Sequence, residues 1–88
     1  NWENVYEIID NLYSGFHSRL HQRYGDLLSD KEEQIIVLMT AGFSTKEISV
    51  ITRQTTATIY VRKSSIRKKL GVPEKEDIVS FLRQPASD

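Results

Sequence analysis

The apolar residues follow a helical spacing along the whole chain, and no Asn-Gly or Asp-Gly turn separates alternating runs. Near the N-terminus they recur at intervals of three and four: Trp2, Val5, Ile9, Leu12 and Phe16. This stripe predicts one long amphipathic helix from about residue 2 to residue 24. Gly15 interrupts the helix at a cost of about 1 kcal/mol relative to alanine, and Gly25 is expected to cap its end.

Two roles remain open for this N-terminal segment, residues 1–25. The stripe either packs against the rest of the domain or forms a coiled-coil seam between two copies of the chain. Because Arg19 occupies the next seam position after Phe16, we favour packing.

A second helix begins at a capping box, in which Ser29 and Glu32 each bind a free backbone N–H group of the other residue. The apolar run 35–39 that follows is too hydrophobic to lie on a surface. Gly42 should end this helix, with Phe43 folding back on its last turn in a Schellman-type contact.

A third helix begins at another capping box, formed by Ser44 and Glu47. We expect Ile48 and Ile51 to face the core, and the helix to end near residue 52 or 53. Thr55 then offers an N-cap for a fourth helix over residues 56–70, which Gly71 ends.

A last helix is predicted over residues 74–82, with acidic residues in its first turn, where they suit the helix dipole. Its apolar face consists of Ile78, Phe81 and Leu82. The fold class is therefore all-α: a tetrahelical helix-turn-helix over residues 26–83, preceded by the long N-terminal helix and followed by a tail, residues 84–88, that we expect to be disordered.

The net charge of the 88 residues is zero, but the charges are segregated. Residues 1–34 hold seven acidic and three basic side chains, whereas residues 44–70 hold seven basic and one acidic. Residues 71–88 hold four acidic and two basic. The basic block favours an anionic partner and a solvated helix face about equally, when charge alone is considered.

The predicted helix 56–70 has two distinct faces on a wheel of 100° per residue. Ile59, Ile66 and Leu70 point to the core, and the opposite face is small, polar or basic. Such a face suits the major groove, where a methyl group meets thymine and donors meet base edges, although it could also cover another part of the domain. We favour the groove, with five candidate base-contacting residues: Ala57, Tyr60, Val61, Ser64 and Arg67.

The starts of the third and fourth helices combine free N–H groups with hydroxyl and ammonium groups, which bind phosphate well. Basic residues at the end of the fourth helix reach the DNA backbone in the same hypothesis. The candidate phosphate contacts are Ser44, Thr45, Lys46, Thr55, Thr58, Lys68 and Lys69.

Several segments resemble the LuxR/GerE family of regulators. Residues 28–32, Leu-Ser-Asp-Lys-Glu, are similar to its Leu-Thr-x-Arg-Glu opening, and residues 41–49 to its Gly-hydrophobic-Ser-x-Lys-Glu-Ile-Ala stretch. Thr58-Ile59 stands where Thr-Val is usual, and residues 66–72 where Ile-x-x-Lys-Leu-x-Val is usual. The resemblance covers about residues 28–82 and keeps its spacing throughout.

The resemblance implies the output domain of a bacterial transcription regulator that binds double-stranded DNA as a homodimer. The absence of cysteine fits a reducing cytosol, so we expect the domain in the cytoplasm. It places groove contacts on Tyr60, Val61 and Ser64, and backbone contacts on Lys46, Thr55, Thr58 and Lys69. The last helix would form the dimer contact, through Ile78, Phe81 and Leu82. A chain that begins at Asn1 is also expected to be part of a longer protein, which the resemblance suggests is often membrane-tethered.

The chain departs from the family pattern near the predicted turn. Thr52 replaces a usual leucine and Gln54 a usual isoleucine, which makes the turn more polar. Arg62 stands where many members have histidine, and Tyr60 stands where lysine is frequent. Because this chain has Tyr60 in place of a lysine that would contact bases, the DNA sequences preferred by the family should not be assumed for this chain.

Other classes of function find little support in the sequence. His17 and His21 stand four apart on a helix, but no further ligand has a supporting spacing, so we interpret them as solvated rather than metal-binding. The chain has no cysteine, no phosphate-binding glycine loop and no catalytic dyad, so we predict no enzyme, no cofactor and no small-molecule site. The alternative is a helix-turn-helix module that contacts RNA polymerase or another regulator without reading DNA, as sigma-factor regions of this kind contact protein partners.

Overall fold

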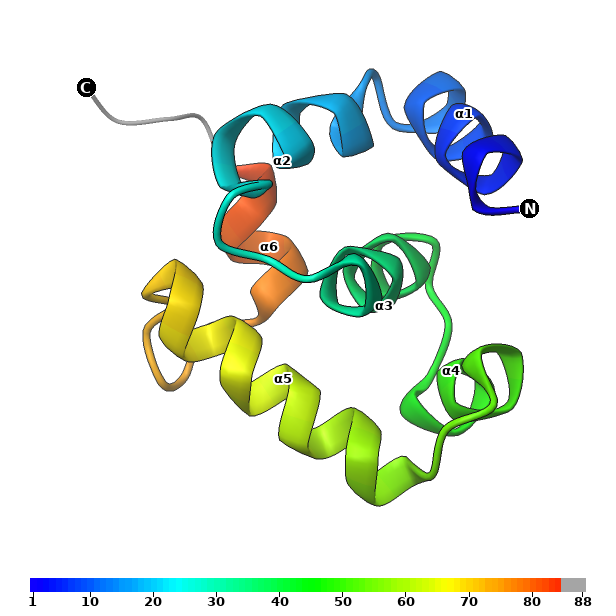
Figure 1. The fold of residues 1–88 in the computed structure, drawn as a ribbon. Helices are drawn as coiled ribbons and strands as arrows, with labels where there is room; N and C mark the ends of the chain where they lie inside the picture. The colour runs from blue at the N-terminus through cyan, green and yellow to red at the C-terminus, as the bar shows by residue number, and fades with distance from the viewer. Residues whose placement is uncertain (85–88) are drawn as a thin grey trace.

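The computed structural model describes residues 1–84, which form six helices and no strand. In chain order these are α1 (Trp2–Leu12), α2 (Phe16–Tyr24), α3 (Asp30–Thr40), α4 (Thr45–Thr52), α5 (Thr56–Leu70) and α6 (Ile78–Arg83). Figure 1 shows α3 in the middle of the domain, with α1 and α2 on one side and α5 on the other. The predicted all-α class is confirmed.

The central position of α3 follows from its sequence. Ser29 and Glu32 form the predicted capping box at its start. The run from Ile35 to Leu38 is buried on every side, and α3 contacts each of the other five helices. A helix that is apolar all round is stable only when other elements cover all of it, so the rest of the chain is arranged around α3.

The expected long N-terminal helix is two helices. The first helix ends at Leu12, and Ser14 and Gly15 after it both take left-handed backbone conformations, with φ of 54° and 79°. Gly15 offers no side chain to cap α2. Asp10 of α1 provides the cap instead: its carboxylate accepts bonds from Ser18 N (3.1 Å) and Ser18 Oγ (2.5 Å). The remote cap fixes α2 against α1 and makes the sharp turn stable.

The apolar stripe of this N-terminal pair is largely occupied within the chain. Ile9, Phe16 and Leu20 are buried in the common core, and Trp2 and Val5 pack against it. Leu12, by contrast, is exposed. Because the break turns α2 away from α1, the stripe does not continue as one coiled-coil seam.

The predicted bounds of α4 and α5 are confirmed. Ser44 and Glu47 form the second capping box, Thr55 caps α5 by accepting a bond from Thr58 N (3.1 Å), and Gly71 ends α5 with φ of 69°. The expectation that Ile51 faces the core is wrong: its side chain is 44% exposed, whereas Ile48 is fully buried. The short α4 turns one face to the core, and Ile51 lies beside that face.

The last helix is shorter than predicted. It begins at Ile78 rather than at residue 74, because the Asp77 side chain accepts a bond from Ser80 N (3.0 Å) and sets the N-cap there. The acidic residues therefore precede the helix instead of lying in its first turn. Of the tail predicted to be disordered, Gln84 is the C-cap residue of α6 and residues 85–88 lie outside the described residues.

Candidate nucleic-acid interface

The two faces of α5 are separated as the helical wheel predicted. Ile59 and Ile66 are fully buried, while Tyr60 and Val61 are 61% and 69% exposed. Ala57, Ser64 and Lys68 are exposed as well. No other helix among residues 1–84 covers these side chains, so this face is available to a ligand.

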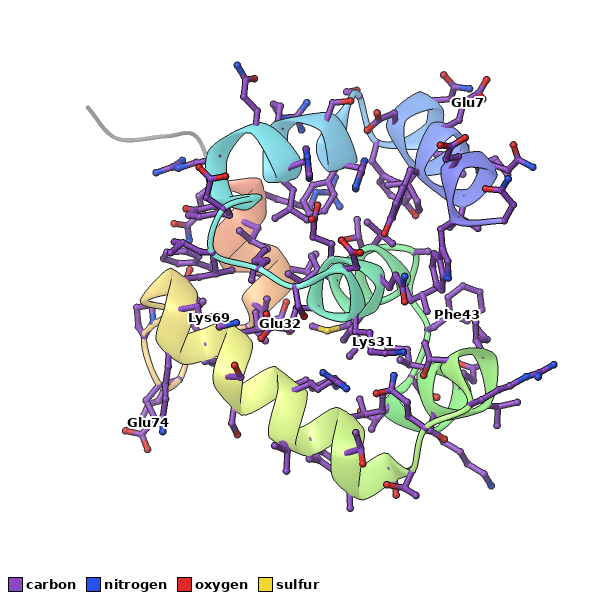
Figure 2. All side chains as sticks on the ribbon, viewed as in Figure 1. Glu7, Lys31, Glu32, Phe43, Lys69 and Glu74 are labelled. Carbon is purple, nitrogen blue, oxygen red and sulfur yellow. The ribbon has the colours of Figure 1, made fainter. Side chains whose placement is uncertain are left out.

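A buried carboxylate fixes the angle between α5 and α3. Figure 2 shows Lys69 of α5 and Glu32 of α3 pointing toward one another, and Lys69 Nζ lies 2.7 Å from Glu32 Oε1. Ser65 Oγ donates to Glu32 Oε2 (2.8 Å), and Ser29 N donates to Oε1 (2.8 Å). Desolvation raises the pKa of Glu32, but the bonds from Lys69, Ser29 and Ser65 outweigh it and hold the pKa below its usual range.

This arrangement gives Lys69 a partner that the sequence did not reveal. Its ammonium balances a buried charge, so part of its bonding capacity is already used within the domain. The single glutamate thus serves both as the capping-box residue of α3 and as the anchor for two residues of α5.

Arg67, expected to contact bases, is also engaged within the domain. Its guanidinium donates to the carbonyl oxygen of Glu76 (2.7 Å) and lies 3.4 Å from that of Pro73. The half-buried side chain therefore holds the segment between α5 and α6. Sequence alone could not assign this role, because the acceptors are backbone groups of an irregular segment.

The polar turn between α4 and α5 is stabilised by side-chain bonds. Thr52 Oγ1 donates to the carbonyl oxygen of Ile48 (2.7 Å), and Arg62 Nε donates to Gln54 Oε1 (2.6 Å). Two departures from the family pattern, Gln54 and Arg62, thus form a pair. Gln54 Nε2 is buried and has no hydrogen-bond partner among the described residues.

Lys63 joins the two helices of the motif. Its ammonium donates to Thr45 Oγ1 (2.6 Å) and lies 5.8 Å from the centre of the Tyr60 ring. Burial lowers the pKa of Lys63. The negative charge of Asp77 raises this pKa, and the positive charge of Arg67 lowers it further. Thr45, a predicted phosphate contact, therefore already accepts a bond from this ammonium.

Three basic residues of α4, α5 and the turn are exposed and have no bonded partner within residues 1–84: Lys46, Arg53 and Lys68. Sequence reasoning selected Lys46 and Lys68 but missed Arg53, which ends α4 with φ of 56° and projects from the turn. Its position in the turn between two capped helices could have marked Arg53 as an exposed cation of the motif. The basic block therefore has fewer side chains free of bonds within the domain than its composition suggests, although only Lys69 is paired with a carboxylate.

The capping hydroxyls at the two helix starts are only partly available. Ser44 Oγ accepts from Glu47 N (3.1 Å), and Thr55 Oγ1 donates to Thr58 Oγ1 (2.9 Å) while accepting from Thr58 N. The first backbone N–H groups of α4 and α5 make no intrahelical bond. Phosphate binding at these starts would therefore rest on backbone groups more than on hydroxyls.

The expected dimer residues on α6 differ in access. Ile78 is fully buried in the core, so it cannot contact a second copy while the domain is folded. Phe81 and Leu82 are half-buried and pack against the same core. The apolar spacing did not distinguish a core face from an interface, because both have the same period.

The histidine pair on α2 has a third neighbour. Glu33 of α3 lies 3.4 Å from His17 Nε2 and 3.0 Å from His21 Nδ1. His21 is solvated as predicted, but His17 is mostly covered, with its ring stacked on Tyr6 at 3.6 Å between centres. The expectation that no further ligand supports the pair is wrong, because Glu33 comes from another helix.

The fold and the exposed face of α5 define a helix-turn-helix domain, with α4 and α5 as the motif. Residues 26–82 match the family model described as bacterial regulatory proteins, luxR family. The chain belongs to this family, and the domain is a DNA-binding domain of transcription regulators. No curated protein and no solved structure matched the chain. None of the helices among residues 1–84 has the length and apolar character needed to span a membrane.

Proposed function

We propose that this domain reads specific duplex DNA sequences by placing the exposed face of α5 in the major groove. The observation that carries the proposal is the surface formed by Tyr60, Val61 and Ser64, which no other helix in the described part of the chain covers. The Val61 methyl groups suit the thymine methyl, and the hydroxyls of Tyr60 and Ser64 suit polar base edges. Ala57, one turn before Val61, lets the backbone approach the groove closely.

Phosphate contacts flank this surface in the proposal. Lys46, Arg53 and Lys68 supply the free cations, and the N–H groups at the starts of α4 and α5 supply neutral donors. Lys69 and Arg67 act indirectly, by holding α5 against α3 and against the segment before α6.

Two adjacent lysines provide a matched test of these roles. The binding sequence is first selected from random duplexes, and affinity is then measured by fluorescence anisotropy over a range of salt concentrations. Lys68→Gln should weaken binding and reduce the slope of log affinity against log salt by about 0.9, the contribution of one phosphate contact. Lys69→Gln should leave that slope unchanged, and Lys75→Gln serves as the control outside α4 and α5.

Base reading is tested separately with Val61→Ala. Loss of the apolar contact should weaken binding by about 1 kcal/mol, or about fivefold in affinity, for duplexes that carry the contacted thymine. The preference for bases at other positions of the site should not change. An unchanged sequence preference would show that α5 is oriented differently. If no sequence is enriched, and removing Lys68 does not alter binding to any duplex, the DNA-reading proposal fails.

We further propose that the domain binds DNA as a homodimer. An inverted repeat in the selected sequences, with two chains per duplex by analytical ultracentrifugation, is the expected result. The accessible parts of Phe81 and Leu82 on α6 are the candidate contact, since Ile78 is buried. Leu82→Glu should then prevent the second chain from binding while leaving the first.

One observation favours a protein partner as a second function. Phe43, Val50 and Ile51 are exposed on and beside α4 and line a shallow apolar hollow with Lys46 and Glu47. A contact with RNA polymerase or a regulator would use this hollow, away from the groove-facing residues of α5. Val50→Glu should abolish such a contact without changing DNA affinity.

A further inference from the structure

A cluster of donor atoms lies on the side of α3 that faces α2. His17 and His21 stand one turn apart on α2, so their rings share a face. Glu33, from the first turn of α3, points its carboxylate between them: Oε1 lies 3.4 Å from His17 Nε2 and 3.0 Å from His21 Nδ1, and Oε2 lies 3.1 Å from His21 Nδ1. One ligand atom from each residue lies within 4.8 Å of the other two.

These separations suit a small divalent cation. A tetrahedral ion with bonds of about 2.0–2.1 Å holds its ligand atoms about 3.3 Å apart. The two nitrogen–oxygen distances of 3.4 and 3.0 Å bracket this value. The carboxylate thus already lies at a ligand-to-ligand distance from each imidazole, and the two imidazole nitrogens lie within 4.8 Å of one another.

The burial of Glu33 makes the cluster unusual. Its side chain is 4% exposed, and among the described residues the two imidazoles are its only hydrogen-bonding or ion-pairing partners. The neighbouring Glu32 is equally buried but has the Lys69 ammonium to balance its charge. A buried carboxylate is costly unless it is paired or coordinates a metal, and Glu33 has no lysine or arginine partner among the described residues.

The surroundings orient the His17 ring and leave space for the His21 ring. His17 stacks on Tyr6, with 3.6 Å between ring centres and 3° between planes, so its ring orientation is fixed. Gly25 leaves room beside the other ring, because a Cβ atom at that position would lie 3.1 Å from His21 Nδ1. A ligand held in place as His17 is lowers the cost of binding an ion.

We propose that His17, His21 and Glu33 form a binding site for a divalent transition metal, with Zn²⁺ as the best-suited ion. Two imidazoles and one carboxylate are a donor set for Zn²⁺ and its neighbours, whereas Mg²⁺ and Ca²⁺ prefer oxygen ligands alone. The His21 side chain is 63% exposed, so the remaining coordination position opens to water. The bound ion would tie α2 to α3, and so the N-terminal helix pair to the DNA-binding domain.

The test uses the untagged chain after dialysis against a chelator, titrated with Zn²⁺ by calorimetry. One ion per chain should bind, the thermal unfolding temperature should rise with Zn²⁺, and Mg²⁺ should have no effect. The ring ¹⁵N signals of His17 Nε2 and His21 Nδ1 should shift together on binding. Binding of one ion by two chains, or no binding, would overturn the proposal.

Variants separate this site from a simple pair of surface histidines. His21→Ala should lower Zn²⁺ affinity more than about 100-fold, since loss of even a supporting second-shell group costs about 10–100-fold. Gln22→Ala, an exposed neighbour on α2, is the matched control and should change nothing. Glu33→Gln keeps the size of the side chain and should lose binding as well. Affinity in the folded His21→Ala protein within about threefold of the original would refute the site, even if the Glu33 variant failed to fold.

Discussion

The bond from Lys69 to the buried carboxylate of Glu32 gives the sharpest prediction about stability. Lys69→Met keeps the aliphatic stem of the side chain and removes only the ammonium. Glu32 would then retain its bonds from Ser29 and Ser65 but lose the positive charge that lies 2.7 Å away. The substitution therefore isolates the contribution of one charge-assisted contact between α3 and α5.

The expected loss in the free energy of unfolding is about 1–2 kcal/mol. A hydrogen bond to a charged group contributes about 1.5–3 kcal/mol. Because the Lys69 side chain is 38% exposed, water can replace part of the lost contact, which places the estimate at the lower end. For a domain of this size, that loss lowers the melting temperature by about 4–16 °C.

The loss should depend on pH in a direction set by Glu32. Its pKa in the folded protein lies below the ordinary value of 4.5, so the ionised carboxylate stabilises the fold above about pH 4.5. This stabilisation disappears as the pH falls through the folded pKa. The difference between the original protein and Lys69→Met should thus be full at neutral pH and shrink in acid.

Urea unfolding followed by far-ultraviolet circular dichroism measures both effects. Lys68→Met is the matched control, because Lys68 is exposed and has no bonded partner among residues 1–84, and it should change stability by less than about 0.5 kcal/mol. A double-mutant cycle with Glu32→Gln should give a coupling energy of about 1 kcal/mol. Equal stability of the two lysine variants would refute the role assigned to Lys69.

Three further substitutions test other parts of the fold. Asp10→Ala removes the carboxylate that accepts the two bonds from Ser18, and should lower the free energy of unfolding by about 0.5–2 kcal/mol in urea. Burial raises the pKa of Asp10, but the bonds from Ser18 outweigh it and hold the pKa below 3.8. The difference between the two proteins should therefore vanish in strong acid, and a difference that persists there would contradict the prediction. Gly25→Ala should destabilise the domain by about 1–3 kcal/mol despite the ordinary φ of −58°, because a Cβ atom would lie 2.4 Å from a backbone carbonyl oxygen; a melting temperature at or above the original would refute this. Arg67→Gln should make the segment around Glu76 sensitive to proteolysis well before the rest of the chain unfolds. An unchanged cleavage rate would show that the bond from Arg67 to the Glu76 carbonyl oxygen does not hold this segment in place.

The sequence alone determined the local features of the fold. Each capping box, at Ser29 and at Ser44, joins residues only three positions apart in the sequence. Its formation depends on the local sequence alone, and both boxes were predicted correctly. The same holds for α5, whose bounds and buried face follow from Thr55, Gly71 and a single helical period. Family motifs added the helix-turn-helix assignment, which the family match confirms.

The tertiary structure decided which side chains are free to act. Lys69 and Arg67 look like DNA contacts in sequence, but their partners lie 37 and 9 positions away and become visible only when the helices pack. Glu33 joins His17 and His21 for the same reason, across 16 and 12 positions. Local patterns fix where helices begin and end because those interactions span one turn, whereas pairing between helices depends on how the core brings distant segments together.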